Sequence, residues 1–258
     1  MGMGTIIGWI LFGLLVGTGG TLIGAGGGFL IMPFFLIFFK NKNPEVISAI
    51  SLAVVCANAC SGSFAYAKMK RINYKAGILF SLAAVPGAVA GSLIINYIPI
   101  KTYNLIFGLI LISFGTYLFL SVRNGLHPKH EAHSIPPYNV KVGMVISALT
   151  GLVSSLLGIG GGIIHVPMMV YLLNFPVHFA TATSHFTLAV MTLAGTIAHI
   201  YHNDLAGQWL IIIMMIMGVI TGAQIGAKLS QKVKGALIIK ILAGTLIFVG
   251  LRITYQGL

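Results

Sequence analysis

Two glycine-rich segments interrupt apolar stretches of the chain and are the first candidates for chemistry. They are GAGGGFLIMP at residues 24–33 and GIGGGIIHVP at residues 158–167. Because each glycine costs a helix about 1 kcal/mol relative to alanine, a cluster of this density is expected to break the helix. A helix that restarts after the break offers free backbone N–H groups and the positive end of its dipole. The pattern therefore predicts an anion-binding site that needs no cationic side chain.

Six glycines of these segments are predicted to bind a substrate through their backbone. The competing interpretation is close helix packing through small residues. Irregular backbone inside a membrane survives only where protein buries it or where it lines an aqueous cavity, which favours a binding site. The predicted glycines are Gly26, Gly27, Gly28, Gly160, Gly161 and Gly162.

Hydroxyl side chains follow each glycine segment within the next apolar stretch. Most of them are expected to bond the backbone carbonyl four residues earlier. Ser51 and Ser184 occupy corresponding positions in the two halves of the chain, so both could approach a shared axis. We predict Ser51, Thr183 and Ser184 as substrate contacts, with a carbonyl bond as the alternative for each.

Histidines are the remaining side chains that could carry a proton inside the apolar stretches. His165, His185 and His199 lie deepest in them. An imidazole can gain a proton near neutral pH, and the protonated ring can also pair with an anion. We predict His165 and His185 as the better site candidates. A neutral imidazole bonded to a neighbouring helix is the alternative.

Two further sets of residues were candidates for chemistry and are interpreted as inert. Cys56 and Cys60 lie one helical turn apart, which suits a disulfide poorly, and a thiol in apolar surroundings is expected to be unreactive. His127, His130 and His133 have a spacing that could bind a metal, but a solvated linker is the favoured interpretation. We therefore predict no catalytic residue, no metal site and no cofactor.

The composition excludes whole classes of protein. Of the 258 residues, 57% are hydrophobic and 7% are charged, whereas soluble domains carry about 25% charged residues. The carboxylates are Glu45, Glu131 and Asp204, and none lies inside a long apolar run. That excludes paired-carboxylate catalysis and acidic proton relays in the membrane. The net charge of +12 is interpreted as loop charge that obeys the positive-inside rule, with no nucleic-acid partner.

The apolar segments predict an all-α polytopic protein of the cell (inner) membrane, since about 20 apolar residues span a bilayer as a helix. Repeat 1 covers residues 1–122, a polar linker covers 123–140, and repeat 2 covers 141–258. Each repeat is expected to hold a glycine-broken helical hairpin followed by three spans. The predicted helical segments are 4–23, 29–39, 46–67, 76–98 and 102–121 in the first repeat, and 141–158, 163–174, 178–200, 207–228 and 236–254 in the second.

An internal duplication relates the halves, and the charges indicate its orientation. The glycine segments match without a gap, and AIS at 49–51 matches ATS at 182–184. Basic residues crowd the loop at 68–75 in the first half but the loop at 228–236 in the second, which are different positions in the repeat. If both loops are cytoplasmic, the repeats are inverted. The rival arrangement has four crossings per half and parallel repeats.

The residues resemble the sulfite exporter TauE/SafE family, also called the four-toluene sulfonate uptake family. The resemblance rests on GAGGGFLIMP and GIGGGIIHVP in tandem halves, on AIS and ATS in the following spans, and on PGAVAG and TGAQIG further along. It covers essentially the whole chain. The resemblance implies a multi-pass carrier of small sulfur-containing or organic anions, with substrate and direction differing among members.

We therefore expect a secondary transporter of a small anion such as sulfite, thiosulfate, sulfoacetate or another organosulfonate, with export as the favoured direction. Opposed half-helix N-termini would hold the anion, and rocking of the repeats would give alternating access. The expected partners are the anion, the lipid bilayer and a possible coupling ion, H⁺ or Na⁺. An anion channel is one alternative. The other is a membrane enzyme of sulfur chemistry that uses Cys56 or Cys60.

Overall fold

The computed structural model describes residues 2–39, 42–123, 135–233 and 235–257, and over these residues the chain is helical with no strand. The first half contains α1 (Met3–Ile23), α2 (Gly28–Phe38), α3 (Pro44–Lys68), α4 (Tyr74–Ile94), a 3₁₀ turn η1 (Ile95–Tyr97) and α5 (Ile100–Arg123). The second half contains α6 (Val140–Leu157), α7 (Gly162–Leu172), α8 (Val177–Tyr201), α9 (Trp209–Ser230) and α10 (Gly235–Gly257). The predicted all-α fold is confirmed.

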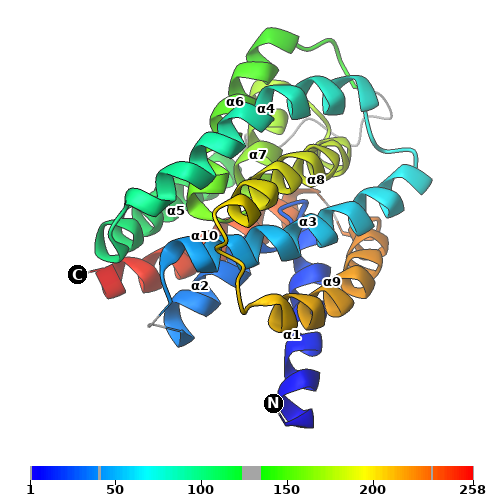
Figure 1. Cartoon of the computed structure of the whole chain (residues 1–258). Helices are drawn as coiled ribbons and strands as arrows, with labels where there is room; N and C mark the ends of the chain where they lie inside the picture. The colour runs from blue at the N-terminus through cyan, green and yellow to red at the C-terminus, as the bar shows by residue number, and fades with distance from the viewer. Residues whose placement is uncertain (1, 40–41, 124–134, 234, 258) are drawn as a thin grey trace.

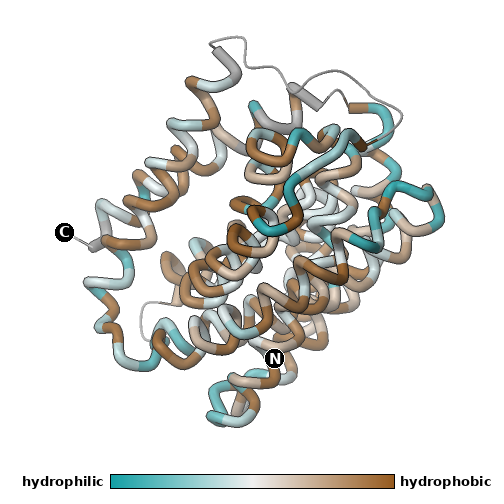
Figure 2. The backbone as a smooth tube through the Cα atoms, turned by 90° about the horizontal axis from the view of Figure 1, so that it is seen from above, coloured by the Kyte–Doolittle hydropathy of each residue, from teal (hydrophilic) through white to brown (hydrophobic). Residues whose placement is uncertain are grey.

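Six of these helices are long and apolar enough to cross a membrane, namely α1, α3, α4 with η1, α5, α6 and α9. Helices α2 and α7 have 11 residues each, which is about 16 Å at 1.5 Å per residue and therefore too short for a span. Figure 2 shows mostly hydrophobic tubes along the helices, with hydrophilic segments gathered at their ends. The structure supports a multi-pass membrane protein. The part of the predicted linker that carries His127, His130 and His133 lies outside the described residues.

Helices of one half pack lengthwise on helices of the other half. The backbone of Gly13 in α1 lies against Met215 in α9, and Gly17 lies against Val219 one turn further on. Because the residue numbers of the contacting positions increase together in both helices, α1 and α9 run parallel. Helices α4 and α6 form the corresponding parallel pair. The lack of a side chain on the contacting glycines lets these helix backbones approach closely.

Corresponding helices of the two halves pack against each other in antiparallel fashion. Gly62 of α3 lies against His185 of α8, while Gly195 of α8 lies against Leu52 of α3. The residue numbers of the contacting positions rise along one helix as they fall along the other, so α3 and α8 are antiparallel. Both helices lie in the middle of the molecule (Figure 1). Helices α5 and α10 also pair in this way, with Gly108 beside Gly250 and Gly115 beside Ile247.

Candidate substrate site

Each glycine segment forms a sharp break whose backbone only glycine adopts readily. Gly24 ends α1 in the left-handed region, and Gly27 precedes α2 with a φ of 88°. The second break repeats this geometry, with Gly158 at the end of α6 and Gly161 before α7. A side chain at a positive φ is strained. The glycines with positive φ in the two breaks are Gly24, Gly26, Gly27, Gly158, Gly160 and Gly161.

The two breaks touch each other, which places the N-terminal ends of α2 and α7 side by side. A Cβ added to Gly28 would lie 2.5 Å from the carbonyl oxygen of Ile159. In the corresponding contact, Gly162 lies against the carbonyl of Gly24 and against Ala25. The predicted glycines of both halves are therefore brought together, although their distance along the chain is large.

The meeting point lies at the middle of the two central helices. Gly26 and Gly160 each contact Val55 of α3 and Leu188 of α8. α3 and α8 have 25 residues each, and Val55 and Leu188 lie near their midpoints. The side chain of Leu188 is buried, as is that of Val55. An aliphatic pair thus fills the space between the breaks.

Backbone N–H groups at the break remain available for a ligand. In the described part of the chain, the N–H groups of Leu30 and Ile31 donate to the carbonyl of Gly27, whereas those of Gly27 and Gly28 donate to no backbone carbonyl. The first N–H groups of any helix lack an intrahelical acceptor. Both breaks therefore have the donors and the dipole that favour an anion.

A buried polar network connects His185 to the first break. The Asn58 side chain donates from Nδ2 to the carbonyl of Gly26 at 2.8 Å, and the Thr21 hydroxyl donates to Asn58 Oδ1 at 3.1 Å. His185 Nε2 lies 3.3 Å from the same hydroxyl oxygen. The Tyr66 hydroxyl donates to the Thr21 carbonyl at 2.6 Å. The network thus joins α1, α3 and α8 next to the first glycine break.

The protonation of His185 follows from this network. Thr21 has one hydroxyl proton, and when that proton goes to Asn58 Oδ1, His185 Nε2 is the donor to Thr21. In a neutral ring the other nitrogen, Nδ1, then carries no proton. That atom is buried and has no hydrogen-bond partner among the described residues.

The other predicted site residues lie in three different surroundings. Ser51 donates to the carbonyl of Gly158 at 2.6 Å, which places it at the second break. Ser184 is buried, and its hydroxyl has no partner within the described residues. Thr183 accepts a hydrogen bond from the backbone N–H of Asn73 at 3.0 Å, so its hydroxyl is engaged at the start of α4.

The second predicted histidine, His165, lies apart from His185. Its Nε2 is 3.0 Å from the Ser147 hydroxyl of α6, and its ring meets the edge of Phe80. Ser147 in turn donates to the carbonyl of Gly143. This is the arrangement expected for an imidazole bonded to a neighbouring helix. His165 and His185 thus belong to separate networks.

Sequence reasoning did not predict three members of the network, Thr21, Asn58 and Tyr66. Thr21 precedes the first glycine segment by three residues, as Ser155 precedes the second, and that repeated hydroxyl was a signal. Tyr66 carried no such sequence signal, because a tyrosine near the end of a span is ordinary at a membrane interface. Its role depends on the contact between α3 and α1.

Neither cysteine takes part in the polar networks of the two glycine breaks. Cys60 is exposed, and Cys56 is half-buried with its thiol 3.8 Å from the carbonyl of Ala189. We expect the double variant Cys56→Ala/Cys60→Ala to transport at no less than about half of the wild-type rate, because neither thiol belongs to the site networks. Flux measured in liposomes checks this. A rate below a tenth of wild type in folded protein would revive the thiol alternative.

An all-helical bundle in which two short helices meet at the middle of the central helices is the kind of fold found in multi-pass membrane transporters. The chain belongs to the family Sulfite exporter TauE/SafE, which matches residues 9–253. The chain is 29% identical to the probable membrane transporter protein YunE of Bacillus subtilis, with 96% of this chain and 97% of YunE covered. It is 31% identical to a probable membrane transporter protein of Methanocaldococcus jannaschii, with 87% and 86% covered. No solved structure matches this chain.

Family membership fixes the general function. The protein is a membrane transporter that acts on a small-molecule substrate from within a cell membrane. The predicted family and the predicted membrane location are confirmed.

Proposed function

We propose that this protein is a secondary transporter of a small sulfur-containing anion, such as sulfite, thiosulfate, sulfoacetate or another organosulfonate, with export as the favoured direction. The observation that carries the proposal is the contact between the two glycine breaks, which faces the N-terminal ends of α2 and α7 toward one region. The anion binds there through the N–H groups of Gly27, Gly28 and Gly160–Gly162, whereas the N–H of Gly26 donates to the carbonyl of Gly20 and shapes the break. The hydroxyl of Ser184 completes the site, and Ser51 gives its one proton to the carbonyl of Gly158 and so holds the second break in place. The family name, sulfite exporter, supports the substrate class.

The antiparallel packing of corresponding helices supports inverted repeats. When equivalent spans such as α3 and α8 run in opposite directions, the repeats are related by an axis in the membrane plane. The axis passes near Val55 and Leu188, where the contacts of Gly26 repeat those of Gly160. Rocking of one repeat against the other then exposes the same site alternately to each side of the membrane.

The aliphatic pair at the centre acts as a gate in this proposal. Val55 and Leu188 both contact the glycine breaks, so an anion reaches the N–H groups only after these side chains move. The described structure is therefore interpreted as a closed state. The hydroxyls and N–H groups behind the gate replace the water that the anion loses.

Proton coupling through His185 is part of the proposal. Its Nδ1 has no hydrogen-bond partner in the described part of the protein, and its Nε2 is tied to the glycine break through Thr21 and Asn58. A proton on Nδ1 adds positive charge close to the anion, so proton and anion favour each other's binding. Sodium coupling and uncoupled exchange are the competing outcomes.

Flux measurements on purified protein in liposomes test the proposal. Radiolabelled sulfite and sulfoacetate should cross with saturating kinetics, and unlabelled anion on the opposite side should accelerate the flux. A channel would show neither saturation nor this acceleration. Folded protein that moves none of the sulfur anions in either direction would refute the proposed substrate class.

Sidedness of two loops tests the inverted arrangement. In a Cys56→Ala/Cys60→Ala background, single cysteines replace Lys75, Lys232 or Tyr97, all exposed positions. We expect a membrane-impermeant maleimide to label the first two from the cytoplasmic side and Tyr97→Cys from the outside, because α4 separates residue 75 from residue 97. Labelling of Lys75→Cys and Lys232→Cys from opposite sides would overturn inversion.

A further inference from the structure

Two ionisable side chains form a hydrogen-bonded pair where α8 ends, apart from the network of His185. His199 Nδ1 lies 2.7 Å from Asp204 Oδ2, and this is the one ion pair among the residues that the structure describes. The His199 ring is fully buried, whereas the Asp204 side chain is 12% exposed. The carboxylate therefore lies between a buried imidazole and the surface at this end of the molecule.

The other ring nitrogen of His199 lies on the side of the second glycine break. Its Nε2 is 3.5 Å from the hydroxyl oxygen of Ser48, and Ser48 donates to the carbonyl of Ser155 at 3.3 Å. The same carbonyl accepts the N–H of Gly158, the residue that ends α6 at the break. A Cβ added to Gly158 would also meet Ser48 Oγ at 2.8 Å. A chain of polar contacts thus runs from Asp204 to the break.

A protonated His199 ring satisfies this chain of contacts better than a neutral ring does. A charged imidazole donates from both nitrogens, to Asp204 and to Ser48, and Ser48 then keeps its one proton for the carbonyl of Ser155. When a neutral ring holds its proton on Nδ1, Ser48 cannot supply both the bare Nε2 and that carbonyl. The Asp204 carboxylate offsets the cost of burying the charged ring.

Two further ionisable groups act on the His199 ring. Glu45, in the first turn of α3, interacts with it electrostatically and favours its charged form. His202, at the end of α8, opposes that charge when it is itself protonated. Because two carboxylates stand against one imidazole, the charged groups around the ring together favour a proton on it.

The first repeat carries a different pair at the corresponding helix end. In the alignment of the two repeats, Tyr66 corresponds to His199 and Arg71 corresponds to Asp204. The N–H of Arg71 donates to the carbonyl of Tyr66 at 3.3 Å, and the N–H of Asp204 donates to the carbonyl of His199 at 3.0 Å. The turn after the helix is therefore repeated, but its ionisable pair is not. The need for a turn thus does not explain why an imidazole and a carboxylate meet in the second repeat.

We propose that His199 and Asp204 form a proton-binding site that acts on the second glycine break through Ser48. Uptake of one proton converts a neutral ring beside a carboxylate into an imidazolium–carboxylate pair, and this step does not depend on transport. Its effect on the anion rests on the proposed function. The charged ring holds Ser48 on the carbonyl of Ser155 and adds positive charge near the break, so proton and anion favour each other's binding. His185 belongs to the first break and His199 to the second.

Nuclear magnetic resonance on the full-length protein in liposomes, with isotope-labelled histidine, detects the proton directly. The signal of His199 is the one that is lost in His199→Gln. We expect the wild-type ring to carry two protons at the acidic end of the range from about pH 5 to pH 8. Asp204→Asn should lower the pH of half-protonation by about one unit or more, because an amide accepts the same hydrogen bond without compensating the charge.

The matched control is Glu45→Gln, which removes the carboxylate that is not hydrogen-bonded to the ring. It should shift the protonation of His199 less than Asp204→Asn does. A wild-type ring that keeps a single proton throughout this range would overturn the proposal. Equal protonation of His199 in wild type and in equally stable Asp204→Asn would also overturn it.

The link to the glycine break is tested by exchange of toluenesulfonate, whose sulfonate keeps its charge over the same pH range. In a His185→Gln background, the KM for this anion should fall about fivefold or more as the pH is lowered, and His185→Gln/His199→Gln should lose this dependence. A KM that responds to pH equally in both variants would overturn the link. Protonation of His199 without flux of any sulfur anion would refute the transport function alone, and flux with a ring that never gains the second proton would refute the proton site alone.

Discussion

Replacing Gly162 with alanine is expected to abolish transport and to lower the stability of the folded protein by about 1–3 kcal/mol, the usual cost of overpacking. The new Cβ would collide with the backbone carbonyl of Gly24 and with Ala25. Backbone cannot move aside as a flexible side chain can, so the two breaks must separate. Flux in liposomes and the melting temperature in detergent measure both effects.

A matched glycine separates this effect from a general intolerance of alanine. A Cβ at Gly19 in α1 would meet nothing closer than Leu30 Cδ1 at 3.8 Å. Gly19→Ala should therefore retain transport and equal or exceed wild-type stability, since alanine favours a helix. Gly28→Ala should fail as Gly162→Ala does, because it meets Ile159 in the corresponding contact. Wild-type flux by Gly162→Ala would contradict the contact between the breaks.

Replacing His185 with glutamine is expected to uncouple transport from the pH gradient. Glutamine can still donate to the Thr21 hydroxyl from its amide, but it cannot take up the proton that the proposed mechanism places on Nδ1 of His185. Uptake against a concentration gradient, driven by a pH gradient, should fall about tenfold or more. Exchange of labelled for unlabelled anion, which needs no net proton movement, should continue.

The control for this prediction is the other buried histidine. His165 bonds Ser147 and lies apart from the network of His185, so His165→Gln should keep its response to the pH gradient. If His185→Gln responds to the gradient as wild type does, His185 is not the proton carrier. A response to a sodium gradient in its place would identify the alternative coupling ion.

The sequence was sufficient to predict the elements that depend on local properties. Glycine clustering predicted breaks at Gly26 and Gly160, and the structure has left-handed glycines at both. Apolar length predicted each helix to within a few residues, since burial in lipid requires a continuous apolar helix. Hydroxyl repetition pointed to Ser51, which bonds the carbonyl of Gly158. Each of these signals is a matter of residue type and spacing within a short segment of the chain.

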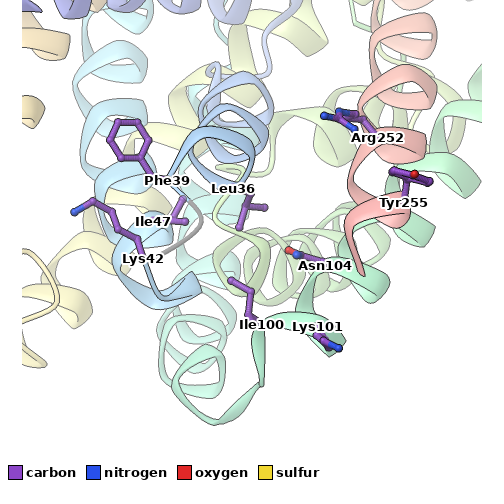
Figure 3. Close-up of a pocket in the computed structure, with 9 residues that line it drawn as sticks. All are labelled: Leu36, Phe39, Lys42, Ile47, Ile100, Lys101, Asn104, Arg252 and Tyr255. Carbon is purple, nitrogen blue, oxygen red and sulfur yellow. The ribbon is translucent and has the colours of Figure 1, made fainter. Parts of the chain in front are cut away.

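What could not be predicted depends on which helices touch. No feature of the neighbouring sequence distinguishes Val55 or Leu188 from other aliphatic residues, yet both contact the glycine breaks. Thr183 has the same hydroxyl as a site residue but bonds Asn73, because the loop before α4 approaches α8. One pocket of about 450 Å³ is lined by Lys101 of α5 and Arg252 of α10, which are far apart in the sequence and share this region through the packing of α5 with α10 (Figure 3).

The pairing of α1 with α9 has a consequence for biosynthesis. The glycines of α1 pack on Met215 and Val219, which belong to a helix made much later than α1. At a synthesis rate of about 5–20 residues per second, α1 waits roughly 10–40 seconds for that partner. During this interval its glycine-lined face must be shielded by lipid, by the insertion machinery or by a chaperone. Neither half of the chain can complete its fold alone, so assembly is governed by the end of translation.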